Sequence, residues 1–171
     1  MKKTRELTLS AILTALGVIL LLFGKLVPSL DIVALLFASL PIVFAMLELR
    51  RVWAYLIYAA TAALSMILVF SFVSLEYLLF GGLYPILKYY FERLPRRLSL
   101  IPKLLFFNFV AAFAVMLGKR LLGLELSLSR ELLLVTWLLA NLTFLIYDLL
   151  MTQMILRYLV QIRGRIKRFL K

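Results

Sequence analysis

The sequence contains no cysteine and no histidine among its 171 residues. Without cysteine the chain forms no disulfide and has no thiol for redox or nucleophilic chemistry. Without histidine it also lacks the imidazole that, with thiolate, makes up the usual transition-metal sites. A phosphate-binding loop of the form Gly-x-x-x-x-Gly-Lys-Ser/Thr is missing too, so ATP-driven work would need partner chains. We expect a protein that is not an enzyme and that holds no metal or cofactor.

Acidic residues are scarce, with 8 Asp and Glu against 20 Lys and Arg, and the formal net charge is +12. Hydrophobic residues make up 65% of the chain, and the mean hydropathy is +1.06. A chain of this composition has too little polar surface to cover a water-soluble fold, which predicts an integral membrane protein. We see no internal repeat or linker and expect residues 1–171 to form a single membrane domain.

Six apolar segments approach or reach the roughly 20 residues that a helix needs to cross a bilayer. Basic residues precede the first segment and no small-residue cleavage site follows it, so we expect it to be retained rather than removed as a signal peptide. The fourth segment is short and holds two glycines and a proline. The expected helices are residues 7–23, 30–49, 52–70, 75–90, 101–117 and 132–156. The predicted fold class is all-α, a polytopic bundle of six transmembrane helices.

The distribution of basic residues predicts the orientation, because loops retained in the cytoplasm carry most of the Lys and Arg. With the N-terminus inside, every Lys and Arg falls on the inner side except Lys25, Lys119, Arg120 and Arg130. We therefore expect a multi-pass protein with both termini in the cytoplasm. The positive charge then follows from topology and from attraction to anionic membrane lipid, and no nucleic-acid partner is expected.

Two inner segments each have two interpretations. Residues 157–171 place apolar side chains at spacings of three and four among arginines and lysines, as in a basic amphipathic helix at the membrane interface. Such a tail either anchors the chain to lipid or contacts a cytoplasmic partner. The arginine-rich connection 91–102 has the same two interpretations.

Polar side chains inside membrane helices are costly and are expected to face the bundle interior. Counted at 1.5 Å per residue, Asn108 in the fifth helix and Asp148 in the last helix lie at similar depths in the inner half, as do Tyr84 and Lys88 in the fourth. We expect these four residues to form one intramembrane polar cluster. It is either a structural clasp between helices or a proton or ligand relay, and its lone aspartate lacks the partners that hydrolysis requires.

A second set of residues lies towards the outer ends of the expected helices. Asp31 and Glu76 are acidic, Tyr77 and Trp137 are aromatic, and Asn141 lies one turn from Trp137. Together they are candidates to line an outward-facing ligand pocket with apolar walls and a few directing polar groups. Trp137 is equally explained as an interfacial aromatic residue, and Glu76 as a solvated one.

The first expected helix carries Ala11 and Ala15 one turn apart, which leaves a shallow strip where another helix can approach closely. With six short helices, both termini inside, and the stretch Leu40-Pro41-Ile42-Val43 in the second helix, the chain resembles the S components of energy-coupling factor (ECF) transporters. It is also similar in plan to small uncharacterised bacterial membrane proteins, through residues 84–88 with Asn108 and Asp148.

The resemblance to S components implies a substrate-binding subunit in a bacterial plasma membrane, for a vitamin or a similar small micronutrient. It implies that Ala11 and Ala15 dock onto a membrane coupling subunit, and that cytoplasmic ATPases drive the cycle. One alternative is a non-transport membrane scaffold of an envelope or lipid-synthesis complex. Another is a small proton-coupled carrier that uses Asp148.

Overall fold

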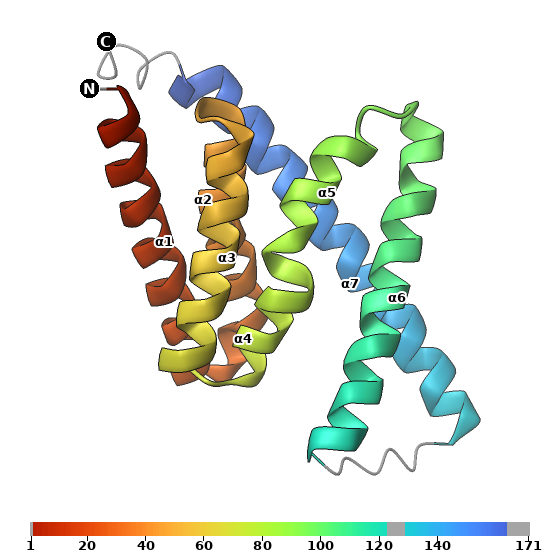
Figure 1. Cartoon of the computed structure of the whole chain (residues 1–171). Helices are drawn as coiled ribbons and strands as arrows, with labels where there is room; N and C mark the ends of the chain where they lie inside the picture. The colour runs from red at the N-terminus through yellow and green to blue at the C-terminus, as the bar shows by residue number, and fades with distance from the viewer. Residues whose placement is uncertain (1, 123–128, 164–171) are drawn as a thin grey trace. The chain divides into compact units, whose positions relative to one another are not determined.

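The computed structural model describes residues 2–122 and 129–163, and every regular element in these ranges is helical (Figure 1). By internal contacts the chain divides into two units, the first with α1 to α6 and the second with α7 and η3. The elements are α1 (Lys2–Leu26), η1 (Pro28–Leu30), α2 (Asp31–Glu48), α3 (Arg51–Leu68), α4 (Phe72–Glu76), η2 (Tyr77–Gly81), α5 (Leu83–Phe91), α6 (Arg96–Leu122), α7 (Arg130–Arg157) and η3 (Tyr158–Ile162).

Five helices within the described part of the chain are long and apolar enough to cross a membrane. They are Lys3–Leu26, Asp31–Glu48, Arg51–Leu68, Leu98–Leu117 and Arg130–Gln161. Each one contains or overlaps one of the segments predicted from hydropathy. The protein is therefore all-helical with the composition and helix lengths of a multi-pass membrane protein.

The fourth predicted segment, residues 75–90, is helical but is not one continuous α-helix. It consists of α4, the π-helical turn η2 and α5, and it is not among the five candidate spans. A Cβ atom on Gly81 would lie 2.5 Å from Leu35 Cδ1, and one on Gly82 would lie 2.5 Å from Tyr58 Cδ2. The two glycines thus bring this stretch against α2 and α3, and Pro85 lies in the first turn of α5, where its missing N–H matters least.

The expected connection 91–102 is shorter in the structure, because α6 already begins at Arg96 and contains Pro102. The N–H groups of Leu98 and Ser99 donate to the Pro95 carbonyl at 2.8 and 3.0 Å, so Pro95 rather than Pro102 marks the start of the helix. At the other end of the chain, α7 continues through the π-helical turn η3. The predicted amphipathic tail lies outside the described residues from position 164 onwards.

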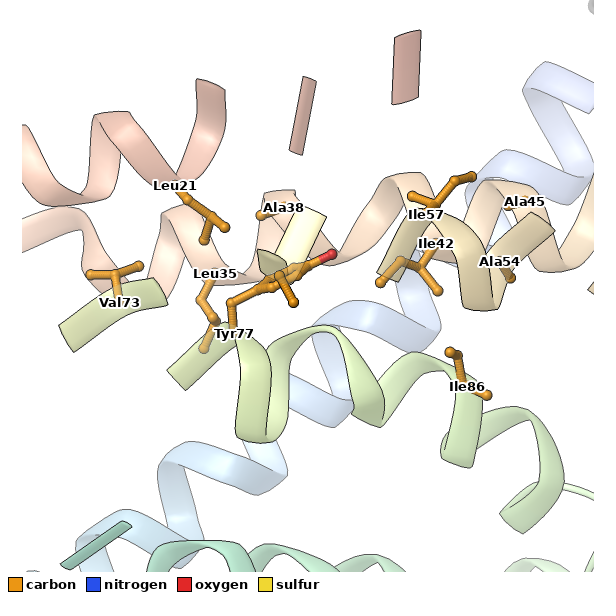
Figure 2. Close-up of a cluster of buried hydrophobic side chains, with 11 residues drawn as sticks. Leu21, Leu35, Ala38, Ile42, Ala45, Ala54, Ile57, Val73, Tyr77 and Ile86 are labelled. Carbon is orange, nitrogen blue, oxygen red and sulfur yellow. The ribbon is translucent and has the colours of Figure 1, made fainter. Parts of the chain in front are cut away.

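The core of the first unit is built from small and branched residues of α1, α2, α3 and the α4–η2–α5 stretch (Figure 2). Glycines of α1 also make close helix contacts: a Cβ on Gly17 would lie 3.0 Å from Thr61 Cγ2, and one on Gly24 would lie 2.9 Å from Ala34 Cβ. Lipid is as apolar as a leucine side chain, so close van der Waals contact of this kind holds membrane helices together. The core residues are Leu21, Leu35, Ala38, Ile42, Ala45, Ala54, Ile57, Ala62, Val73, Tyr77 and Ile86.

Three buried hydroxyl side chains of the first unit bond to carbonyl groups of their own helices. Thr14 Oγ1 donates to the Ser10 carbonyl at 2.9 Å, Ser39 Oγ to that of Leu36 at 2.6 Å, and Ser65 Oγ to that of Ala62 at 3.0 Å. All three hydroxyl residues are buried. This local bonding satisfies a polar group without water, as a hydrocarbon environment requires.

The Gly24 contact predicts a large effect from a small substitution. Gly24→Val puts a branched side chain where even a Cβ is too close to Ala34, so α1 and α2 must separate, which we expect to cost about 1 to 3 kcal/mol. Reversible unfolding in mixed micelles measures this loss. Ala60→Val also introduces a valine, at an exposed position of α3, and is the control. Equal stability of the two variants would contradict close packing at Gly24.

Candidate functional site

Helix α1 has two faces with different roles. Ser10, Thr14, Gly17, Leu21 and Gly24 are buried in the first unit. The predicted docking residues Ala11 and Ala15 are exposed on the other side of the helix, next to the exposed apolar residues Ile12, Leu16 and Ile19. The small-residue strip is therefore on the surface of the first unit and does not serve its internal packing.

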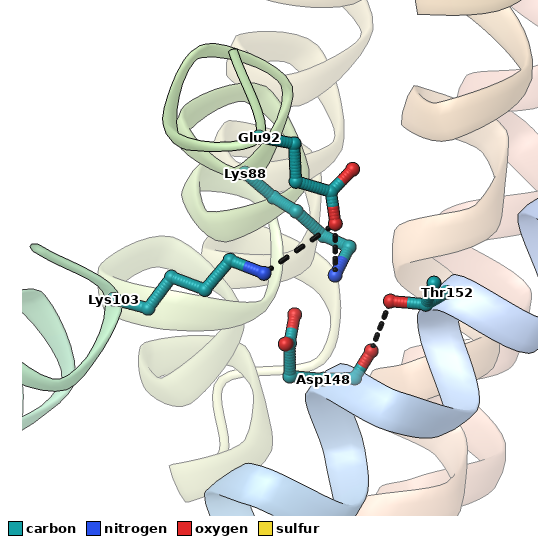
Figure 3. Close-up of polar contacts among 5 residues, drawn as sticks. All are labelled: Lys88, Glu92, Lys103, Asp148 and Thr152. Carbon is teal, nitrogen blue, oxygen red and sulfur yellow. Dashed lines mark hydrogen bonds and ion pairs between the residues drawn. The ribbon is translucent and has the colours of Figure 1, made fainter. Parts of the chain in front are cut away.

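Two members of the predicted polar cluster, Tyr84 and Lys88, are fully buried in the first unit, with 0% and 1% of their surface exposed. Lys88 Nζ lies 6.0 Å from the centre of the Tyr84 ring and 2.8 Å from Glu92 Oε1 (Figure 3). The same Glu92 oxygen lies 3.4 Å from Nζ of Lys103, a buried residue of α6. One carboxylate thus binds two buried lysines and ties α5 to α6.

Glu92 and Lys103 were not among the residues predicted for this cluster. The spacing of Lys88 and Glu92 by four residues would have indicated the ion pair, because side chains at i and i+4 meet on one face of a helix. Glu92 was missed because it falls after the predicted end of the fourth helix. In the structure α5 continues to Phe91, and the Glu92 N–H still donates to the Lys88 carbonyl at 2.9 Å.

Asn108 lies in α6 and donates from Nδ2 to the Leu104 carbonyl at 2.9 Å. Two residues before it, Phe106 stacks on Tyr84 with ring centres 6.3 Å apart, and Phe80 stacks on Tyr84 at 5.1 Å. An aromatic cluster therefore lies at the contact of α6 with η2 and α5. These rings give the buried Lys88 ammonium an electron-rich neighbour in Tyr84.

Asp148 belongs to the second unit, in which α7 is helical throughout. Its backbone carbonyl accepts a hydrogen bond from Thr152 Oγ1 at 2.8 Å (Figure 3). Asn141 precedes Asp148 by seven residues, so the three polar residues share one helix face. The meeting of Asp148 with Tyr84, Lys88 and Asn108 stays a prediction.

The acidic candidates for the outer pocket, Asp31 and Glu76, both belong to the first unit, at the start of α2 and the end of α4. Glu76 lies outside the five candidate spans and is partly buried rather than solvated. Burial, together with the negative charge of Asp31, raises the pKa of the Glu76 carboxyl to about 7. Asp31 Oδ1 is buried and accepts no hydrogen bond from the described residues. The two carboxyl groups therefore form an acidic pair that is poorly solvated.

The other three candidates for the outer pocket are Tyr77, Trp137 and Asn141. Tyr77 is fully buried in the core of the first unit, and its ring centre lies 6.4 Å from that of Tyr58. Trp137 and Asn141 lie in α7 of the second unit, where Asn141 Nδ2 donates to the Trp137 carbonyl at 2.9 Å and Trp137 is exposed. An outer pocket that joins these residues to Asp31 and Glu76 stays a prediction.

A cavity of about 500 Å³ opens between the first turns of α1 and α3. Trp53 Nε1 donates to Glu6 Oε2 at 2.8 Å beside it. Its lining mixes basic and apolar side chains and contains none of the predicted pocket residues: Lys3, Thr4, Glu6, Leu7, Arg50, Val52, Trp53 and Leu56. Within the described ranges no group of three or more acidic residues gathers as a metal site.

Comparison with family models, with curated proteins and with solved structures found no match for this chain.

The ion pair of Lys88 predicts a coupled effect on stability. Glu92→Gln keeps the shape of the side chain but removes the charge that binds the buried Lys88, so we expect a loss of about 1 to 3 kcal/mol in the free energy of unfolding. The double variant Glu92→Gln with Lys88→Met should recover part of this loss, since one of the two buried charges that Glu92 binds is then absent. A double-mutant cycle in mixed micelles measures the coupling, and strictly additive losses would contradict it.

The same cycle with Asp148→Ala in place of Glu92→Gln tests whether Asp148 joins the cluster. As a clasp, Asp148→Ala should also cost about 1 to 3 kcal/mol, with part of it recovered by Lys88→Met. Losses from Asp148 and Lys88 that simply add would show that the two residues do not meet.

The raised pKa of Glu76 predicts how stability depends on pH. Because the folded pKa of about 7 lies above the ordinary value of 4.5, the folded protein holds more protons than the unfolded chain between these two values. Its free energy of unfolding should therefore fall as pH rises through this window. Glu76→Gln should remove that part of the slope, and Asp31→Asn should reduce it. Unfolding curves recorded from pH 4.5 to 8 measure the slopes, and identical slopes for parent and Glu76→Gln would be inconsistent with a buried Glu76.

Proposed function

We propose that this chain is the substrate-binding membrane subunit of a transporter, similar to the S components of ECF transporters, and that partner ATPases supply its energy. The observation that supports this most strongly is the exposed pair Ala11 and Ala15 on the spanning helix α1. Small residues on a lipid-facing surface gain little from contact with acyl chains, whereas they permit another helix to approach closely. The strip therefore favours a protein partner in the membrane.

The shape of this face suits helix docking. Ala11 and Ala15 form a shallow strip, and the exposed side chains of Ile12, Leu16 and Ile19 stand beside it. A partner helix can place its own side chains against the alanines and pack against these larger neighbours, as ridges pack into grooves. The Ser10 and Thr14 hydroxyls already donate to carbonyl groups of α1, so docking needs only apolar packing.

The buried face of α1 explains why docking need not disturb the fold. Gly17 and Gly24 hold α1 close to α3 and α2, so the helix is fixed before a partner arrives. A fixed helix loses little conformational freedom on association, which lowers the free-energy cost of binding. The first unit thus offers a preformed surface.

The acidic pair Asp31 and Glu76 indicates the chemistry of the solute that this subunit would bind. A buried carboxylate oxygen that accepts no hydrogen bond from the described residues favours a ligand with hydrogen-bond donors or a positive charge. We propose that these two carboxyl groups direct the solute, while apolar side chains provide most of its contact area.

Purification of the tagged chain from its native membranes in a mild detergent tests this function. We expect a membrane coupling protein and two cytoplasmic ATPases to accompany it, and native mass spectrometry should detect a small molecule on the chain in stoichiometric amount. Recovery of the chain alone, from membranes in which a coupling protein with ATPases is present, would contradict the proposal.

The docking face predicts a separation of assembly from stability. Replacing both Ala11 and Ala15 by Leu should leave the isolated protein folded, because lipid solvates larger apolar side chains well. The same change should block close approach of a partner helix and abolish most of the complex. Ala59→Leu with Ala63→Leu changes an exposed pair with the same spacing on α3 and is the matched control. Pull-down yield and thermal unfolding measure the two effects; equal recovery of complex from both double variants would overturn the assignment.

A non-transport scaffold is the second candidate. It is favoured by the position of Tyr77, which packs in the core rather than facing a ligand, and it shares the α1 docking face with the first proposal. A scaffold binds partners but no solute. A small molecule retained in stoichiometric amount would therefore exclude it.

A further inference from the structure

Two arginines from different parts of the first unit converge on one tyrosine. Arg51, the first residue of α3, donates from Nη2 to the Tyr89 hydroxyl oxygen at 3.1 Å, and Arg93, just after α5, donates from Nη2 to the same oxygen at 3.0 Å. Both guanidinium groups also lie over the Tyr89 ring, 5.2 and 4.9 Å from its centre. Two positive charges are thus held together although like charges repel.

The surrounding groups keep this arrangement in place. Arg93 also lies 5.6 Å from the centre of the Tyr90 ring, which meets the Tyr89 ring edge to face at 5.5 Å. The Tyr90 hydroxyl lies 3.1 Å from that of Tyr55 on α3. Within the described residues, neither arginine forms an ion pair with a carboxylate. Both charges therefore contact aromatic rings and the Tyr89 phenol oxygen.

The cluster lies where a lipid headgroup is expected. Arg51 begins a candidate span, and Trp53, two residues later, bonds to Glu6 in the first turns of α1. The start of α1, the start of α3 and the end of α5 therefore share one end of the first unit, and Arg51 and Arg93 are exposed there. Lipid phosphates lie at this level, just beyond the hydrocarbon core.

We propose that Arg51, Arg93 and Tyr89 form a binding site for the phosphate group of an anionic phospholipid headgroup. Guanidinium groups match phosphate oxygens in geometry and bind them through paired charge-assisted hydrogen bonds. The Tyr89 oxygen accepts from both arginines and keeps its own O–H to donate to the anion. A bound phosphate would also neutralise the two neighbouring charges.

The lowered pKa of the Tyr89 phenol is consistent with a phosphate-binding site. The hydrogen bond from Arg93, together with the charges of Arg51 and Arg93, lowers the pKa of the Tyr89 phenol from its ordinary value. A phenol polarised in this way is a stronger hydrogen-bond donor, which strengthens its contact with a phosphate oxygen.

Native mass spectrometry of the full chain in detergent tests the site, with phosphatidylglycerol, phosphatidylcholine and inorganic phosphate as probes. We expect one phosphatidylglycerol to be retained in preference to phosphatidylcholine. Arg51→Gln with Arg93→Gln should weaken its retention about ten- to a hundredfold, and Tyr89→Phe should weaken it to a smaller extent. Thermal unfolding of each variant checks that it is folded.

The matched control is Lys3→Gln with Arg50→Gln, which removes the same charge at the same end of the unit, beside the cavity. Retention close to that of the parent supports a discrete site. An equal loss in the control would show that binding follows overall charge and would overturn the proposal. Equal retention of the two lipids, or displacement of phosphatidylglycerol by inorganic phosphate at an equal concentration, would also overturn the assignment to a lipid headgroup.

Discussion

A polar group in the hydrocarbon core of a membrane has no water to bind, so the protein itself must satisfy it. This constraint accounts for the local hydrogen bonds along the helices. Thr14, Ser39 and Ser65 bond back to carbonyl groups of the first unit, and Thr143 donates to the Leu139 carbonyl of α7 at 2.9 Å. It also accounts for Lys88, whose buried ammonium is matched by a carboxylate one turn away.

The same environment removes the usual reason for apolar helices to associate, because lipid and leucine are alike. Close contact takes its place, and the glycines of α1 and of the stretch before α5 provide it. These contacts leave Ala11 and Ala15 outside the core, which is why the small residues of α1 divide into an internal set and an exposed set. The proposed partner contact depends on this division.

Five of the six helices expected from hydropathy correspond to candidate spans, because a run of about twenty apolar residues is the pattern typical of a membrane-spanning helix. It did not predict the interruption of the fourth, which depends on Leu35 and Tyr58 packing against Gly81 and Gly82 from other helices. Pairing of Arg51 with Tyr89 likewise joins positions 38 residues apart, so no local pattern indicates it. Local spacing is sufficient to predict the small-residue strip of α1 and the ion pair of Lys88. The interruption of the fourth helix and the contact of Arg51 with Tyr89 depend on tertiary contacts.

Placement of both termini in the cytoplasm, which the distribution of Lys and Arg predicts, requires an even number of crossings, so we expect the chain to cross once more in the stretch between Phe70 and Leu94, besides the five long helices. Since the chain has no cysteine, single cysteines at Phe70 and Leu94, on either side of this stretch, report its topology without background. Labelling of intact cells with a membrane-impermeant maleimide measures their accessibility, with Ser29→Cys in the first connection expected outside as reference. The account predicts that Phe70→Cys reacts in intact cells and that Leu94→Cys reacts only after permeabilisation. Reaction of both positions from the same side would contradict it.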